Sequence, residues 1–244
     1  MYGFELKNAN KSRFSSLICN KLQYDEWNTS KPGASNDRIW RTTMSDLTLV
    51  KQKPKAVVIM WSGINRSEFV VHVRNKWLWK NGTWKSYKLD KNTMCASKDS
   101  HMSGNIDVND THYNIMNNYM KSKPSVHSLR YTIASMLSIK ALCKSLNIPL
   151  LNYTFSRTQY VDNLDTLDWL MYDSTNGDEP TPDISKREVL QELPFIEEPG
   201  FYDYCKLNNL PIGKKDHPLE DAHVWMANKI IKDLKKHGIH QKTN

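Results

Sequence analysis

The fold of this chain is decided by the stretch Lys55-Ala56-Val57-Val58-Ile59-Met60-Trp61, which is almost entirely apolar and directly follows Pro54. A short continuous apolar run of this kind is typical of a β-strand that is buried on both faces. A second such run, residues 148–155, comes directly after a long helical pattern that places Leu129 and Ile133 on one face. A helix followed by a buried strand indicates a right-handed crossover. The sequence therefore predicts an α/β fold with a parallel sheet covered by helices on both sides.

Further helices are predicted from apolar periodicity. The clearest begins at Leu219, from where apolar residues recur at three- and four-residue spacing: Leu219, Ala222, Met226, Ile230 and Leu234. Pro218 suits the first position of this helix, and Gly238 can close its C-terminus. Two other helices are expected over residues 12–22 and 38–51.

Residues 70–124 have a different pattern, and we interpret them as an insertion. Asn81-Gly82 is a strong turn signal between Trp77-Leu78-Trp79 and the polar, aromatic stretch 83–87, which predicts a β-hairpin. Its tryptophans either line a substrate wall or simply pack the hairpin onto the domain, and the sequence leaves both interpretations open. A second irregular region, residues 173–199, is rich in Pro, Asp and Glu and is expected to form a surface loop or lid.

The length of 244 residues fits one large α/β domain, so we expect a single domain over residues 1–244 with the insertion 70–124 inside it. No apolar run approaches the ~18 residues of a membrane span, and the first 20 residues contain no apolar signal region. We therefore expect no membrane partner. The four cysteines are scattered without a Cys-x-x-Cys pair, which favours a reducing, cytoplasmic setting over a disulfide framework.

The formal net charge of +8 raises the question of nucleic acid as a partner. The lysines are spread along the whole chain with no basic run longer than a pair, so a solvated lysine-rich surface explains the charge and no nucleic-acid partner is expected. Asp216, His217, His223 and Cys205 are residue types that bind zinc. Because the two histidines are six residues apart and do not share a helix face, we expect no metal, and no other cofactor.

Three short segments stand where a parallel sheet would bring loops together. Gly33-Ala34-Ser35-Asn36-Asp37 opens a predicted helix, Gly63-Ile64-Asn65 follows the strand that ends at Trp61, and Asp216-His217-Pro218 precedes the last helix. In parallel α/β sheets the loops after the strands converge on one edge, where such folds bind their ligands. Each segment is a weak signal alone, but their order predicts that Gly33, Asn65 and His217 face a common cleft.

Taken together, these segments resemble the ordered sequence blocks of the SGNH (GDSL-like) hydrolases, which are small flavodoxin-like esterases and acyl hydrolases. In that family a glycine after the second strand, a Gly-x-Asn-Asp loop after the third and a C-terminal Asp-x-x-His-Pro segment serve catalysis. The resemblance implies a three-layer αβα fold with a parallel sheet, serine esterase activity, and an ester substrate that is a small molecule or an acylated carbohydrate. The residue order in segments 33–38 and 217–223 resembles that of phage-encoded members of the family, and this resemblance implies a viral protein in the host-cell cytoplasm.

The resemblance also implies roles for individual residues. Gly33 resembles the glycine whose backbone N–H binds an oxyanion, and Asn65 resembles the asparagine whose side-chain amide does the same. Losing one such donor typically costs ~10²–10³-fold in rate, because negative charge builds on the carbonyl oxygen during acyl transfer. His217 resembles the general base that deprotonates a serine. His223, six residues further on and inside the predicted helix, is expected to be structural.

The chain departs from the family pattern in three places. Arg66 stands where the last aspartate of Gly-x-Asn-Asp belongs, and Lys214 stands where an aspartate is expected three residues before His217. Either the adjacent Asp216 or a backbone carbonyl would then orient the imidazole. In the family, the nucleophilic serine follows the first strand in a Gly-Asp-Ser or Gly-Cys-Ser turn. Residues 1–6 of this chain resemble the family sequence that comes directly after that serine. We therefore expect the first strand and the nucleophile to be missing from this sequence.

Several alternatives stay open at this stage. The missing serine block has two explanations. Either the reading frame was started at an internal methionine, or the chain is a fragment or a degenerate relative of the family. Ser35 is a weak candidate for a substitute nucleophile, and Ser15 and Ser16 are weaker still. The chain is accordingly expected to be an SGNH-type ester hydrolase scaffold, inactive or poorly active without its serine block. The second possibility is a non-catalytic module that holds a glycan or a protein partner on the same fold.

Overall fold

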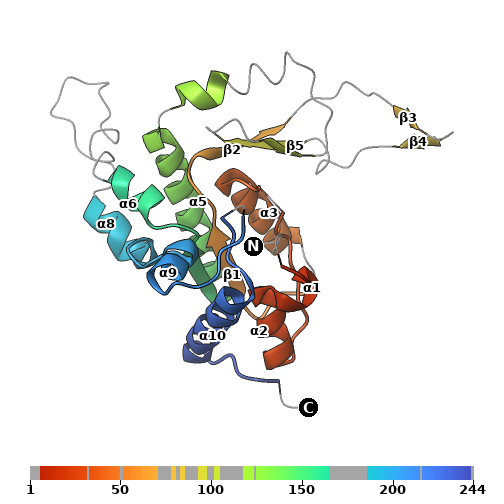
Figure 1. The fold of residues 1–244 in the computed structure, drawn as a ribbon, viewed down its shortest axis with the longest axis vertical. Helices are drawn as coiled ribbons and strands as arrows, with labels where there is room; N and C mark the ends of the chain where they lie inside the picture. Colours follow the sequence, from red (N-terminus) through yellow and green to blue (C-terminus); the bar gives the residue numbers. More distant parts are fainter. Residues whose placement is uncertain are drawn as a thin grey trace.

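The computed structural model describes residues 6–31, 33–49, 52–70, 78–80, 83–85, 93–97, 102–104, 118–123, 125–164, 186–214 and 216–242. At its centre lies a parallel pair of strands, β1 (Val57–Trp61) and β7 (Leu150–Thr154) (Figure 1). Val57 lies opposite Leu150 and Trp61 opposite Thr154. Both strands fall within the predicted apolar runs and are parallel, which confirms the α/β class.

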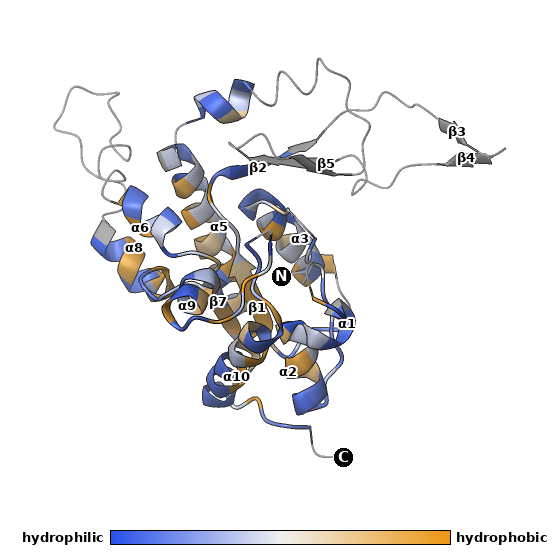
Figure 2. Ribbon diagram, in the orientation of Figure 1, coloured by the Kyte–Doolittle hydropathy of each residue, from blue (hydrophilic) through white to orange (hydrophobic). Residues whose placement is uncertain are grey.

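Side chains of the two strands alternate between two separate hydrophobic clusters. Ile59 and Trp61 join a cluster with Leu129 and Ile133, whereas Leu151 and Tyr153 join a second cluster that includes Ile230. This alternation follows from strand geometry, since successive side chains point to opposite faces of a sheet. Figure 2 shows the apolar strand pair among helices that carry both hydrophobic and hydrophilic residues. Helices therefore cover both faces of the pair, as the sequence predicted.

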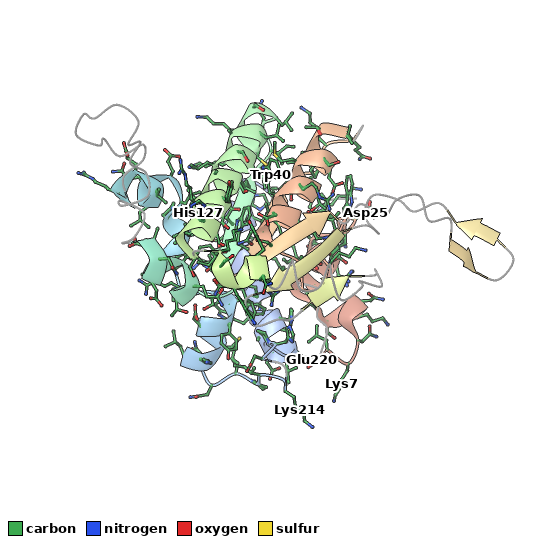
Figure 3. All side chains as sticks on the ribbon, turned by 90° about the horizontal axis from the view of Figure 1, so that it is seen from above. Lys7, Asp25, Trp40, His127, Lys214 and Glu220 are labelled. Carbon is green, nitrogen blue, oxygen red and sulfur yellow. The ribbon has the colours of Figure 1, made fainter. Side chains whose placement is uncertain are left out.

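On the first face, α3 (Asn36–Leu49) and α5 (Ser125–Ser145) pack beside each other, with α6 (Thr158–Leu164), α8 (Lys186–Glu192) and the 3₁₀ helix η2 (Pro194–Ile196) completing the cluster. Trp40 on α3 donates its indole N–H to Ser138 on α5 at 2.7 Å (Figure 3). The expectation of an irregular loop over 173–199 is wrong for residues 186–196. Val189, Leu193 and Ile196 recur at helical spacing and are buried in this cluster. The rest of that prediction, up to residue 185, lies outside the described residues.

On the second face lie α2 (Phe14–Leu22), α9 (Phe201–Leu207) and α10 (Glu220–Lys236), with the short α1 (Ala9–Ser12) preceding α2. Helix α2 occupies most of the predicted segment 12–22, and α3 begins two residues before the predicted 38. The chain enters beside α10, because the Lys7 backbone N–H donates to the Glu220 carboxylate at 3.0 Å (Figure 3).

Both ends of α10 are defined by local contacts. The predicted apolar positions Ala222, Met226, Ile230 and Leu234 are all buried. The expectation that Pro218 is the first helical residue is wrong, because Pro218 forms an antiparallel bridge with Ile212 and the helix begins at Glu220. The prediction for Gly238 is confirmed: its φ is +75°, and the N–H groups of Gly238 and Ile239 reach back to the carbonyls of Lys235 and Leu234. This is the Schellman geometry that favours glycine.

Most described parts of the insertion are β-strands, while residues 118–122 are helical. The hairpin is confirmed as β3 (Leu78–Lys80) and β4 (Thr83–Lys85), while its Asn81-Gly82 turn lies outside the described residues. A second antiparallel sheet, not predicted, has the order β2-β5-β6 from β2 (Arg66–Val70), β5 (Thr93–Ser97) and β6 (Met102–Gly104). The proposed roles of Trp77, Trp79 and Trp84 also rest on side chains outside the described part.

The two edges of β1 differ. The Val57 N–H donates to Pro149, and the Trp61 carbonyl accepts from Phe155, both at 2.9 Å, so the odd-numbered residues of β1 bond towards β7. In a parallel ladder the alternate residues direct their N–H and C=O groups to the opposite edge. Those residues are Val58 and Met60, and no strand among the described residues pairs with them. Within the described structure, β1 is thus an edge strand with both faces covered.

Candidate functional site

Gly33 lies in a tight turn that leads into α3. Its φ is +69°, a conformation that glycine adopts without steric cost, and the following Ala34 N–H bonds back to Lys31 at 3.3 Å. Ser35 then caps the helix, because its hydroxyl accepts the Arg38 N–H at 3.3 Å and its carbonyl accepts the first helical bond, from Ile39. Ser35 is fully buried, so its hydroxyl has a structural role and is closed to a substrate.

The next residue, Asn36, joins the start of α3 to the loop that follows β1. Its side-chain oxygen accepts the Ser62 backbone N–H at 2.8 Å, and its amide nitrogen lies 3.1 Å from the Ser62 carbonyl oxygen. The same nitrogen donates towards Thr132 on α5 and Tyr160 on α6, at 3.2 and 3.1 Å. The Asn36 side chain is only 2% exposed. The Gly33 turn and the loop that carries Asn65 are therefore tied together by one buried amide.

Tyr160 completes this network. It is fully buried, and its hydroxyl donates to the Ser62 carbonyl. Burial raises the pKa of Tyr160 well above its ordinary value, so the phenol keeps its proton and remains a donor at any physiological pH. Asn36 and Tyr160 belong to the site through contacts that no local sequence pattern predicts.

The loop after β1 is tightly packed. A side chain at Gly63 would place its Cβ atom 2.1 Å from the Gln159 Oε1 atom, so only glycine fits there without a shift of Gln159. The Asn65 Oδ1 atom is buried and has no hydrogen-bond partner among the described residues. Arg66, which stands where the resemblance predicts an aspartate, begins β2, is exposed, and donates to the Ser62 hydroxyl at 3.2 Å.

A buried cluster of charges holds β2 against α3. The Glu68 carboxylate accepts two hydrogen bonds from Arg41, at 2.8 and 2.9 Å, and a third from Arg38 at 3.4 Å. The Glu68 backbone N–H donates to the Asp37 carboxylate at 3.1 Å. Only 5% of the Glu68 side chain is exposed. The segment directly after Asn65 is thus fixed to the same helix whose first residues contain the Asn36 amide.

The predicted general base, His217, lies on a small hairpin before α10. The hairpin is closed by the Ile212–Pro218 bridge and by the Gly213 N–H, which donates to the His217 carbonyl at 2.8 Å. Asp216 is exposed with a φ of +58°, and its carboxylate accepts a long hydrogen bond, 3.4 Å, from the Tyr202 hydroxyl of α9. This contact directs the Asp216 side chain towards α9.

The start of α9 is attached to the end of β7. The Asp203 carboxylate accepts the Ser156 hydroxyl and the Gly200 N–H, each at 3.0 Å, and the Tyr202 N–H donates to the Phe155 carbonyl at 2.8 Å. The hairpin with His217 follows α9 and is therefore linked to the carboxyl end of β7, while Gly33 and Asn65 are linked at the end of β1. The structure brings the Gly33 and Asn65 segments together directly. A single cleft shared with His217 stays a prediction.

His223 has a structural environment. The ring is fully buried, its Nδ1 atom accepts the Phe14 N–H at 3.1 Å, and it lies between the rings of Phe14 and Phe201, with centroids 5.7 and 5.2 Å away. Burial lowers the pKa of His223 to about 4, so the ring is neutral at pH 7 with its proton on Nε2. The expectation that His223 is buried with a fixed partner is confirmed.

The other serines considered as nucleophiles also hold structural hydrogen bonds. The Ser16 hydroxyl is buried and donates to Glu26 at 2.8 Å, and the Ser15 hydroxyl accepts from Asn28 at 3.3 Å. Ser15, Ser16 and Ser35, the three serines considered as nucleophiles, therefore all hold structural hydrogen bonds.

Within the described ranges, no group of three or more His, Cys, Asp and Glu side chains is arranged to hold a metal ion. Among those same residues, no helix combines the length and apolar character that crossing a membrane requires. A scan against protein-family models, a search of curated proteins and a search of solved structures each returned no match.

Proposed function

We propose that this chain is an SGNH-type ester hydrolase scaffold with a flavodoxin-like three-layer αβα fold. The observation that supports it best is the buried amide of Asn36, which ties the turn containing Gly33 to the loop containing Asn65. These two segments contain the two oxyanion donors that the family resemblance assigns. The covered faces of the β1–β7 pair are compatible with the layered fold.

In the proposed reaction a serine Oγ attacks the ester carbonyl carbon and its proton passes to the His217 imidazole. The Gly33 N–H and the Asn65 side-chain amide bind the oxygen on which negative charge develops. The alcohol leaves with the proton from His217, and water then attacks the acyl-enzyme by the same route and releases the acid. A backbone carbonyl is the better candidate to orient His217, since the Asp216 carboxylate bonds to Tyr202.

The nucleophile in this proposal comes from a segment other than those of Ser15, Ser16 and Ser35, whose hydroxyls hold structural hydrogen bonds. We place it on a strand that pairs with the open edge of β1, at Val58 and Met60. A strand there, parallel to β1, would end beside Ser62, and a turn after it would face the Gly33 and Asn65 segments. We further propose acylated carbohydrate as the substrate class and the cytoplasm as the setting. The setting is supported by Cys143 and Cys205, which are free thiols buried in the core.

The second candidate function is a glycan-binding module without catalysis. It is favoured by two exposed aromatic side chains, Tyr119 and Tyr131, which are 46% and 59% exposed. The Lys123 ammonium lies 5.7 Å from both ring centroids. Exposed tyrosines offer flat apolar faces on which sugar rings can stack, and the ammonium group would favour an acidic sugar.

Hydrolysis of a short-chain nitrophenyl ester and of acetylated xylan separates the two functions. The assay compares the 244-residue chain, a form extended upstream by an apolar strand and a Gly-x-Ser turn, and the extended form with that serine changed to alanine. We expect turnover only in the extended form, and its loss on His217→Ala. If the 244-residue chain hydrolyses the ester and Ser35→Ala abolishes this turnover, the assignment of the nucleophile is wrong. Xylan binding without hydrolysis by any form would favour the second function.

A further inference from the structure

Asn36 occupies a symmetrical place between the two assigned oxyanion donors. It follows Gly33 by three residues, and its partner Ser62 precedes Asn65 by three residues. The Asn36 side chain bonds to both the N–H and the carbonyl of Ser62, at 2.8 and 3.1 Å, which fixes the peptide groups on both sides of that residue. The short segment from Ser62 to Asn65 then has little freedom, because Gly63 lies against Gln159.

The orientation of the Asn36 amide is determined by its partners. Its oxygen faces a backbone N–H, which can only donate. The Thr132 hydroxyl donates to the Ser128 carbonyl at 2.9 Å, and the Tyr160 hydroxyl donates to Ser62, so both hydroxyls can only accept from the Asn36 nitrogen. An aspartate at this position would place a second carboxylate oxygen where the Asn36 nitrogen now donates to Ser62, Thr132 and Tyr160. That oxygen can only accept, so these hydrogen bonds would be lost in a buried site.

We propose that Asn36 is a positioning residue, which sets the Asn65 side-chain amide at the right place relative to the Gly33 N–H. The proposal rests on the proposed function, because the two donors have a shared task only in an acyl transfer. Asn36 itself is buried away from any substrate and acts through the Ser62 backbone. Its effect is therefore expected on the transition state and not on substrate binding.

The first test needs no activity and uses the chain as given. Backbone and side-chain amide NMR signals are compared between wild type, Asn36→Asp and a matched control, Tyr153→Phe. The control removes another hydroxyl contact, the 2.9 Å hydrogen bond to Asp233, on the opposite face of the strand pair. We expect Asn36→Asp to shift the signals of Gly33 and of the Asn65 side chain, while Tyr153→Phe leaves both in place. Unchanged signals in folded Asn36→Asp would overturn the proposal.

A milder variant covers the case in which Asn36→Asp does not fold. Tyr160→Phe removes one partner of the amide and one donor to Ser62, so it should shift the same two signals by a smaller amount. Shifts confined to α6 would count against the proposal as firmly as unchanged signals in Asn36→Asp.

The second test uses kinetics in the form extended with a Gly-x-Ser turn. We expect Asn36→Asp to lower kcat by about 100-fold with KM nearly unchanged, the pattern of an interaction that acts only in the transition state. Tyr153→Phe should leave kcat unchanged. An increase of KM at constant kcat would overturn the positioning role. If wild type itself gives no turnover the proposed function fails, and the NMR comparison still decides whether Asn36 positions the loop.

Discussion

His223 should make the stability of this protein depend on pH below neutrality. Its ring is fully buried between Phe14 and Phe201, and burial lowers its pKa from the ordinary 6.5 to about 4. Between these two values the unfolded chain binds a proton at this ring, whereas the folded protein keeps it neutral. Because the unfolded state binds more protons in this window, the free energy of unfolding falls as the pH falls.

The size of the effect follows from the two pKa values. At about 1.4 kcal/mol for each pH unit, the interval from 6.5 to about 4 corresponds to roughly 3 kcal/mol of unfolding free energy. This stabilisation is present in full above pH 6.5 and is lost by pH 4. It is a large part of the about 5–15 kcal/mol that separates folded from unfolded states in most domains.

The assay is urea unfolding of wild type and His223→Asn at pH 7.5 and pH 4.5. Asparagine keeps an acceptor for the Phe14 N–H but has no titrating group. Loss of the ring from a packed site should destabilise the variant at pH 7.5 by about 1–3 kcal/mol. Between the two pH values its free energy of unfolding should then fall by about 2–3 kcal/mol less than that of wild type.

The result that would refute this reasoning is a parallel loss of stability in the two proteins. It would mean that the folded ring titrates near its ordinary pKa, and hence that His223 is not held neutral by burial. His127→Asn, on the exposed side of α5, controls for the general effect of removing a histidine.

Three further substitutions test the packing around the candidate site. Glu68→Gln removes the buried negative charge that pairs with Arg38 and Arg41 and should lower the free energy of unfolding by about 3 kcal/mol; a change under about 1 kcal/mol in urea would show that the cluster is solvated. Gly63→Ala should destabilise the protein, because the added Cβ atom meets the Gln159 side chain. Adding Gln159→Ala should restore part of the lost stability, and additive effects of the two substitutions in thermal unfolding would argue against the contact. Gly238→Ala, where nothing lies within 4 Å of the added Cβ, should cost about 1 kcal/mol from backbone conformation alone; no change in Tm would indicate that the helix end relaxes.

The parts of the fold that could be predicted are those with a local signal. The strands β1 and β7 are continuous apolar runs, and α10 combines an apolar period with a closing glycine, so neighbouring residues alone define them. Pro218 shows where local preference fails. Its preference for a first helical position is outweighed by a bridge to Ile212, a contact that no local pattern contains.

The candidate site was only half accessible from the sequence for the same reason. The order of the segments around Gly33 and Asn65 predicted a candidate site, but the amide that joins these segments bonds across 26 residues to Ser62 and across 124 residues to Tyr160. Val189, Leu193 and Ile196 recur at the three- and four-residue spacing of a helix, yet the many Pro, Asp and Glu residues around them favoured a loop. Composition was the weaker guide there, because burial of the apolar positions determined the structure.

The open edge of β1 connects the fold to the proposed chemistry. An ordinary edge strand presents unpaired backbone groups to water and is usually protected by charge or proline. Here Val58 and Met60 are apolar and pack against the second cluster, while helices already cover both faces. A strand added at this edge would gain ladder hydrogen bonds and bury its side chains in cores that exist already. Asn36 joins the segments of Gly33 and Asn65 where β1 ends. In the proposed function, a strand paired with this edge would therefore bring a serine close to both segments.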